Sequence, residues 1–274
     1  MRILCIGDVV GQVGRRTLKK LLPELIREHD IEFVIANGEN AAGGLGITPQ
    51  VADELFASGV DCITTGNHVW RHKEIIERMA KDERLLRPAN YPPETVGYGW
   101  TVLRPRRHSK SEGAVCVVCL LGLVFMEPLD CPFRAVDRIL EEVGELTKVI
   151  VVDFHAEATS EKQAFARYVD GRVSLVFGTH THVMTADECI LPNGTAYITD
   201  VGMTGPIDSV IGMKADAIIH RLVTKLPIKF EPASGRGMLS AVLVDVDEVT
   251  GRAKSIERIL LKEPEAKNAM GEVV

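Results

Sequence analysis

The chain has 274 residues, of which 46% are hydrophobic and 26% are charged, a composition typical of a soluble globular protein. It excludes a fibrous repeat and a disordered chain. The formal net charge is −6, from 32 basic and 38 acidic residues. Because no long basic stretch offsets this acidic balance, the sequence argues against long nucleic acids as partners.

The cysteines and the apolar runs predict the cellular compartment. Most of the six cysteines lie within apolar runs, where free thiols pack as small hydrophobes, as expected in a reducing compartment. Cys116 and Cys119 have metal-site spacing, but they lie in the apolar run 114–121 without a second pair. The longest apolar run, 114–126, is too short to span a bilayer, and the chain begins with a strand pattern rather than a leader. We expect a cytoplasmic protein without a membrane partner; a homo-oligomer stays open.

The first 80 residues alternate between strand and helix patterns. Between the strand patterns 1–7 and 33–36, apolar residues recur with the spacing of one helix face. A second helix is predicted after Thr48, a suitable N-cap, with Pro49 at its first position. This alternation predicts a parallel sheet with right-handed crossovers. The residues of the first helical stripe are Leu18, Leu21, Leu22, Leu25 and Ile26.

The middle of the chain continues this alternation after an irregular, proline-rich stretch at 84–111 that contains a strand at 100–103. A strand, a helix, a strand, a helix and a strand are then predicted at 114–121, 133–146, 149–154, 160–168 and 173–178.

Towards the C-terminus the pattern changes to hairpins. The strand patterns 189–191 and 196–199 flank a proline, an asparagine and a glycine, and the strands 238–246 and 253–261 are joined by a short turn. We therefore expect an α/β fold that is parallel in the N-terminal half and antiparallel towards the C-terminus. It forms a single domain, residues 1–262, followed by a tail at 263–274.

Side chains that can bind metals follow five of the predicted strands. Because the carboxyl ends of parallel strands meet at one edge of a sheet, we expect these side chains to lie together. Singly, each has another interpretation: Asp8 could cap a helix, and Asn67 could lie in a turn. The residues are Asp8 after 1–7, Glu39 and Asn40 after 33–36, Asn67 and His68 after 63–66, His155 after 149–154, and His180 and His182 after 173–178.

The donor types predict the kind of metal centre. Three histidines, two carboxylates and two amides form a mixed nitrogen and oxygen set that suits iron, manganese or zinc rather than copper(I). One ion rarely needs seven donors, whereas two divalent or trivalent ions about 3.5 to 4 Å apart share a carboxylate and clamp a phosphoryl group. The sequence therefore predicts two metal ions.

Two short segments carry a family resemblance. Residues 66–68 read Gly-Asn-His and residues 178–182 read Gly-Thr-His-Thr-His. With these segments the chain resembles the calcineurin-like metallophosphoesterase superfamily, most closely its YmdB-like bacterial phosphodiesterase branch, over residues 1–205. Two departures from the superfamily look like that branch: Val10 replaces the histidine of the opening Asp-x-His motif, and Glu39 replaces the bridging aspartate.

The resemblance implies a metallophosphoesterase-like αββα sandwich and a role for each site residue. Glu39 would bridge the ions, His68 would stay off the metals and protonate the leaving oxygen, and Asn40 would make up for the ligand lost at Val10. Imidazole suits proton donation because its ordinary pKa lies near neutral pH. The implied ligands are Asp8, Glu39, Asn40 and His182 on one ion and Glu39, Asn67, His155 and His180 on the other.

The implied function is a dinuclear metal-dependent phosphodiesterase acting on small cyclic nucleotides. The resemblance favours 2′,3′-cyclic nucleotides, with 3′,5′-cyclic AMP as a further substrate, and implies attack by a hydroxide held between the two ions. Two alternatives stay open: a phosphomonoesterase or nuclease on the same site, and a regulatory metalloprotein that binds a nucleotide or partner with little turnover. His68 favours an enzyme, because a binding site needs no proton donor.

Overall fold

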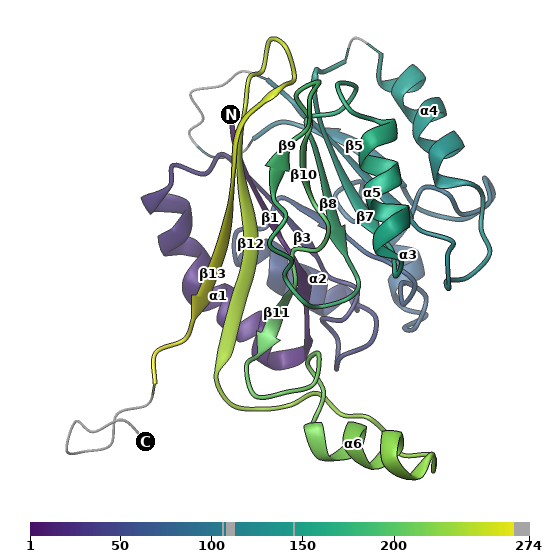
Figure 1. Ribbon diagram of the computed structural model, residues 1–274, viewed down its shortest axis with the longest axis vertical. Coiled ribbons are helices and arrows are strands. Elements are labelled where there is room, and N and C mark those ends of the chain that lie inside the picture. Colours follow the sequence, from purple (N-terminus) through teal and green to yellow (C-terminus); the bar gives the residue numbers. More distant parts are fainter. Residues whose placement is uncertain (106, 108–112, 145, 266–274) are drawn as a thin grey trace.

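Two β-sheets stack face to face, and helices cover both outer faces (Figure 1). The computed structural model describes residues 1–105, 107, 113–144 and 146–265. The first sheet has the strand order β2 (Asp8–Val9), β11 (Met203–Pro206), β12 (Gly237–Val246), β1 (Arg2–Ile6), β3 (Phe33–Asn37) and β4 (Cys62–Thr64), with β13 (Ala253–Lys262) also paired to β12. β1, β3 and β4 are parallel, whereas β12 is antiparallel to β1, β11 and β13.

The second sheet is parallel at its centre and antiparallel at its edges. Its strand order is β5 (Trp100–Leu103), β6 (Val115–Leu121), β7 (Val149–His155), β8 (Leu175–Thr179), β10 (Ala196–Ile198) and β9 (Cys189–Ile190). β6, β7, β8 and β10 are parallel, and the edge strands β5 and β9 are antiparallel to their neighbours. The parallel strands of both sheets therefore bring several carboxyl ends together.

Successive side chains of a strand point to opposite faces of the sheet, so one strand contributes to two hydrophobic clusters. In β1, Ile3 and Cys5 face the space between the sheets, where they join a buried cluster with Val115 and Val117 of β6. The alternate residue Leu4 belongs to a different cluster beneath the helices. The inner cluster is the core of the sandwich, because both sheets contribute one complete face to it.

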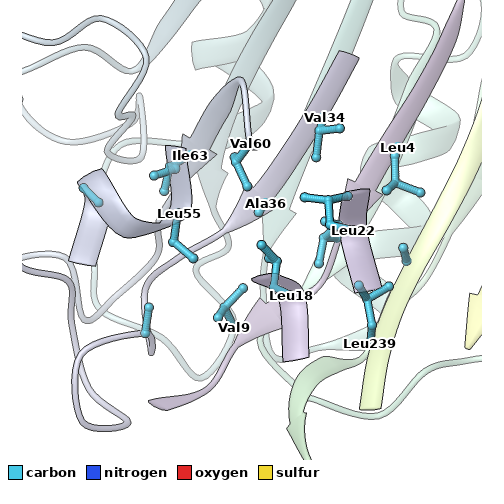
Figure 2. Packing of buried hydrophobic residues seen from close by; sticks show 14 of the residues in the cluster. Leu4, Val9, Leu18, Leu22, Val34, Ala36, Leu55, Val60, Ile63 and Leu239 are labelled. Carbon is cyan, nitrogen blue, oxygen red and sulfur yellow. The ribbon is translucent and has the colours of Figure 1, made fainter. Parts of the chain in front are cut away.

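Helices cover the outer face of the first sheet. α1 (Gly11–Glu28) packs its stripe against β1, β3 and β12, and Figure 2 shows Leu18 and Leu22 beside Leu4, Val34 and Leu239. These contacts confirm the predicted helical stripe. The other helices on this side are α2 (Pro49–Ala57) and the short α3 (Ile75–Met79).

The outer face of the second sheet is covered by α4 (Pro132–Val143) and α5 (Thr159–Tyr168). Val136 of α4 and Phe165 of α5 are buried in the same cluster as Val118 of β6. A last helix, α6 (Ala215–Thr224), extends away from the sheets and has no buried residue (Figure 1). The fold is therefore a sandwich of helices, sheet, sheet and helices, with one projecting helix.

Local signals explain where two helices begin and end. The Thr48 hydroxyl oxygen accepts a hydrogen bond from the Val51 amide at 3.3 Å, and Pro49 is the first residue of α2, as predicted. α4 ends at Val143, earlier than the prediction of 146, because Gly144 has a positive φ of 47° that a helix cannot continue.

The α/β class and the αββα sandwich are confirmed, with one correction. Antiparallel pairing was expected only towards the C-terminus, but β5 already pairs antiparallel with β6, because consecutive strands can pair directly as antiparallel neighbours. The two C-terminal hairpins, β9–β10 and β12–β13, form as predicted.

Glu263, the first residue of the expected tail, is buried, and its carboxylate accepts a hydrogen bond from the Gly237 amide at 2.8 Å. Residues 266–274 of that tail lie outside the described residues. Within the described residues, all six cysteines are free, and Cys116 and Cys119 are buried. No helix in the described part of the chain has the length and apolar content to cross a bilayer.

Candidate metal centre

The predicted site residues lie where strands of both sheets end. Asp8 is in β2, and Glu39 follows the end of β3 by two residues. His155 is the last residue of β7, and His180 directly follows β8. The parallel topology therefore gathers side chains as far apart in the chain as Asp8 and His182 at one edge.

Four donor atoms surround one point of this edge. His155 Nε2 lies 3.1 Å from Asn67 Oδ1, 3.1 Å from Glu39 Oε1 and 3.0 Å from His180 Nδ1. Glu39 and His155 are completely buried, and His180 is partly buried. Nitrogen and oxygen atoms that converge this closely are a suitable ligand set for one cation.

A second group of polar side chains meets the same oxygen of Glu39. His182 Nε2 lies 3.7 Å from Asp8 Oδ1 and 3.1 Å from Asn40 Nδ2, and the Asn40 amide also contacts Glu39 Oε1 at 3.1 Å. Asp8 Oδ1 is buried and has no hydrogen-bond partner among the described residues. Because buried carboxylate oxygens are normally satisfied, this orphaned oxygen fits a bound cation.

Asn40 points its amide nitrogen, not its oxygen, at His182 and Glu39. Its oxygen instead lies 2.9 Å from His68 Nδ1. An amide nitrogen does not ligate a cation, so Asn40 can serve as a ligand only after its side-chain amide turns over. That rotation would exchange its contact with His68 for a metal contact.

His68 is held at the rim of the site. Its backbone N–H donates to Glu39 Oε2 at 3.2 Å, and its ring Nδ1 faces Asn40 Oδ1 and, at 3.3 Å, Glu39 Oε1. The side chain is partly exposed. With Nδ1 engaged by these acceptors, Nε2 is the ring nitrogen that can serve a substrate.

Each histidine of the cluster uses its second ring nitrogen in a contact that orients the ring. A partner of this kind fixes which nitrogen faces the metal. Nε2 of His155 and His182 and Nδ1 of His180 are thereby directed inward. The outer contacts are His155 Nδ1 with Thr179 Oγ1 at 2.8 Å, His180 Nε2 with Glu157 Oε2 at 3.1 Å, and His182 Nδ1 with the Ile211 carbonyl at 2.8 Å.

Asp153 is the buried acceptor behind the His155 contact. The Thr179 hydroxyl donates to Asp153 Oδ1 at 2.6 Å, and Asn37 Nδ2 and the Thr64 hydroxyl donate to Asp153 Oδ2. Burial raises the pKa of Asp153 to about 6, although these donors favour its charged form. One carboxylate thus joins β3, β4, β7 and β8 directly beneath the ligand atoms.

The electrostatics of the cluster favour a positive charge between its members. Burial opposes a charge on His155, yet the adjacent Glu39 carboxylate raises the pKa of His155 to about 9. Burial and the neighbouring His155 lower the pKa of His180 to about 3. Although burial opposes it, His155 and His68 hold the pKa of Glu39 well below its usual value. The Glu39 carboxylate therefore favours a positive charge among these donors, as a bound cation would supply.

The turn that carries two of the histidines has an unusual backbone. His180 and His182 have φ values of 96° and 66°, in the region that favours glycine. Such conformations cost about 1 to 3 kcal/mol each and persist where the surrounding structure holds them. The strain directs both rings towards the same cluster.

The structure brings together the seven predicted ligands and His68, while their roles stay predictions. Asp8 is not a helix cap, because α1 begins after Val10 and has no side-chain cap bond. Sequence reasoning missed two residues that orient the histidines. Thr179 lies between His155 and the Asp153 carboxylate. Glu157, two positions after His155, contacts His180 and offers the same strand-end signal.

Comparison with known proteins identifies the family. The YmdB-like protein family model matches residues 4–259. The chain belongs to the YmdB-like family. It is 49% identical over 263 residues to the 2′,3′-cyclic-nucleotide 2′-phosphodiesterase of Bacillus subtilis strain 168, covering 96% of this chain and 98% of the relative.

Two solved structures that match this chain over nearly their whole length have the same fold. A hypothetical protein from Thermus thermophilus superimposes with a TM-score of 0.88 at 43% identity, covering 96% of this chain and 100% of the other. A novel phosphatase from Mycoplasma pneumoniae gives a TM-score of 0.89 at 33% identity, covering 96% and 93%. Both agree with a metallophosphoesterase-type sandwich.

Proposed function

We propose that this protein is a metal-dependent phosphodiesterase that hydrolyses 2′,3′-cyclic nucleotides. The observation that carries the proposal is the convergence of Glu39, Asn67, His155 and His180 beside the unpartnered oxygen of Asp8. The similarity to the Bacillus subtilis enzyme supplies the substrate class. The name of that relative specifies the 2′ ester bond, so the expected product is a 3′-monophosphate.

The residues divide into a metal-holding set and a proton donor. Asn67, His155 and His180 would hold one ion, Asp8 and His182 the other, with Glu39 between them. Asn40 would join the second set once its amide turns. Two bound ions, of iron, manganese or zinc, would supply an activated water and neutralise charge on the phosphate oxygens.

His68 is the residue we assign to the leaving group. Cleavage breaks the bond between phosphorus and the 2′ oxygen, and a water oxygen replaces that oxygen on phosphorus. The departing 2′ oxygen needs a proton, which Nε2 of His68 can donate from the rim of the site. The contact of Nδ1 with Glu39 orients the ring for this role.

The experiment is a comparison of substrates on metal-loaded protein. We expect hydrolysis of 2′,3′-cyclic AMP to 3′-AMP, blocked by a chelator and restored by added Mn²⁺. Activated aryl phosphodiesters should also be cleaved, and 3′,5′-cyclic AMP is the test of a broader specificity. Release of 2′-AMP would show that the 3′ ester bond is cleaved and contradict the proposal. A protein that binds metal but cleaves none of these diesters would instead be a regulatory binding protein.

A second candidate is a phosphomonoesterase, which the Mycoplasma pneumoniae relative favours because it is called a phosphatase. The same donor set can hold a monoester. Release of inorganic phosphate from 3′-AMP at the rate of 2′,3′-cyclic AMP cleavage would favour this candidate. Accumulation of 3′-AMP would exclude it.

A further inference from the structure

A buried ion pair lies directly behind the turn that carries His180 and His182. Lys162 of α5 is 1% exposed, and Asp200, which follows β10, is completely buried. Lys162 Nζ donates to Asp200 Oδ2 at 2.7 Å and to the backbone carbonyl of Thr179 at 2.7 Å. The lysine thus joins the end of β8 to the carboxylate.

Asp200 in turn binds the residue between the two histidines. Its Oδ2 accepts from the Thr181 amide at 3.1 Å and from the Thr181 hydroxyl at 2.8 Å. Its Oδ1 accepts from the Gly202 amide at 2.8 Å. The backbone of Asp200 is also fixed, because its N–H and C=O pair with the Thr185 hydroxyl and amide at 3.0 Å each. Asp200 therefore holds the middle of the turn and the segment that follows it.

The close approach behind the turn depends on Gly178. A Cβ at this position would lie 1.8 Å from the Thr199 carbonyl oxygen and 3.0 Å from the Lys162 side chain. The Gly178 carbonyl accepts from the Val201 amide at 2.9 Å. Glycine thus lets the lysine stem and the segment before Asp200 reach the backbone that precedes His180.

A role in stability alone explains this pair poorly. Burying a lysine and an aspartate removes both from water, and such pairs are often replaceable by apolar side chains without loss of stability. Here the Lys162 and Asp200 contacts with residues 179 and 181 meet the same backbone that holds His180 and His182 at positive φ. The hydrogen bonds point at the strained turn rather than at the surrounding core.

We infer that Lys162 and Asp200 are positioning residues that hold the His180–His182 turn in its metal-binding conformation. They contact no substrate and act through Thr179 and Thr181. The inference deepens the proposed function and rests on it only where metal binding is concerned. Conformation of the turn itself can be measured in the metal-free protein.

The test compares three substitutions. Asp200→Asn keeps the shape of the side chain but removes the charge that pairs with Lys162. Thr181→Val removes only the hydroxyl donor and keeps the ion pair, so it remains informative if Asp200→Asn fails to fold. Thr181→Ser retains the hydroxyl and is the conservative rescue.

Asp61→Asn is the matched control. Asp61 is also a buried aspartate in an ion pair, with Arg107, and it accepts from the Val34 amide at 2.9 Å. It precedes β4, at the opposite edge of the sheets from the metal centre. Its loss should lower stability without disturbing the turn.

The first readout is hydrogen exchange of the metal-free proteins over residues 178–184. Asp200→Asn should speed exchange of this segment at least tenfold relative to flanking strands, Thr181→Val should speed it several-fold, and Thr181→Ser and Asp61→Asn should stay within twofold of the unsubstituted protein. Unchanged exchange in Asp200→Asn and Thr181→Val would overturn the inference. An equal increase in Asp61→Asn would show a general loss of stability and overturn it too.

The second readout is Mn²⁺ affinity measured by titration. Asp200→Asn should weaken Mn²⁺ binding at least tenfold, and Asp61→Asn should not. If exchange increases but affinity is unchanged, the turn does not position ligands and the inference fails. If the unsubstituted protein binds no Mn²⁺, the proposed function fails, whereas the exchange data still decide whether the pair holds the turn.

Discussion

The two edges of the stacked sheets differ in how their buried polar groups are paired. At the amino-terminal edge these groups satisfy one another: Asp61 pairs with Arg107, and the Ser174 hydroxyl accepts from the Ile150 amide at 3.1 Å. At the carboxyl-terminal edge, Asp8 Oδ1 lacks a hydrogen-bond partner within the described part of the chain, and ring nitrogens of His155 and His180 lie 3.0 Å apart. These polar groups of the amino-terminal edge are paired among the described residues, whereas the donor atoms of the other edge are arranged as a candidate cation site.

We therefore expect substitutions at the two edges to affect different properties of the protein. Substitutions at the amino-terminal edge should change the free energy of unfolding and leave metal binding intact. Substitutions at the carboxyl-terminal edge should change metal binding and catalysis, and some should stabilise the metal-free protein.

The largest effect is expected for His68→Ala. Loss of the proton donor should lower the rate of 2′,3′-cyclic AMP cleavage by about 10² to 10⁴-fold, as for other general acids. An activated aryl phosphodiester, whose leaving group needs no proton, should suffer least. Both ions should stay bound, which metal analysis checks. Equal losses on both substrates would indicate that His68 positions the substrate instead.

The second-largest effect is expected for removal of the metal ions. Because bound ions stabilise only the folded state, Mn²⁺ at 100 times its dissociation constant should raise the free energy of unfolding by about 2.7 kcal/mol per ion. Urea unfolding with Mn²⁺ or with a chelator measures this difference. Glu39→Gln is the control, because it removes the shared carboxylate and should abolish most of the gain. A full gain in that variant would contradict the ligand set.

Asp153→Asn tests the contact behind His155. An amide nitrogen would face one of the hydroxyl donors, Thr64 or Thr179, and disturb the hydrogen bond that orients the ring. Loss of such a supporting contact typically weakens metal affinity by about 10 to 100-fold. Titration with Mn²⁺ should show the weaker binding for the ion held by His155. Unchanged affinity would mean that Asp153 serves stability alone.

Asp8→Asn should raise the stability of the metal-free protein while it lowers metal affinity. Burial raises the pKa of Asp8, so its carboxylate is unfavourable without a cation. An amide carries no charge to bury, so the substitution should stabilise the metal-free protein by about 1 kcal/mol. Metal affinity should fall. Chelator-treated protein that becomes less stable on this substitution would show that Asp8 is already satisfied.

The smallest effect concerns Asp82, whose carboxylate accepts hydrogen bonds from Arg78 and Arg84. Partial burial opposes its charge, but Arg84 and Arg78 lower its pKa from 3.8 to about 2. The folded-state pKa is depressed, so this stabilisation is present above about pH 4 and is lost as pH falls towards 2.

Asp82→Asn should therefore remove part of the acid dependence of unfolding. Because the group is partly exposed, solvent screening limits the loss at pH 7 to less than about 1 kcal/mol. Thermal unfolding between pH 2 and pH 7 measures both quantities, and metal content should not change. An unaltered pH profile would exclude the pair as a source of stability.

Much of this architecture could be predicted from the chain because its signals are local. The stripe through Leu18 and Leu22 marks a helix, and Asp8, Glu39 and His155 each follow an apolar strand. A shared carboxyl edge follows from parallel topology without any three-dimensional information. The family comparison confirms the YmdB-like branch that the resemblance indicated.

The rest depends on contacts between distant segments. Lys162 lies on a helix whose pattern gives no reason to bury an ammonium group, and its partner Asp200 is 38 positions away. Asp200 does follow a strand, just as Asp8 does, so the strand-end signal was present. The orientation of Asn40, with its nitrogen towards His182, is a matter of side-chain packing that no spacing encodes.

The most direct test of the central claim is a count of metal ions per chain by mass spectrometry, on freshly purified protein and on Asn67→Ala. A two-ion centre at the carboxyl edge predicts two ions per chain in the unsubstituted protein and fewer in the variant, with Asp61→Asn retaining two. A chain that holds one ion or none even after Mn²⁺ is added, or an unchanged count in Asn67→Ala, would contradict it.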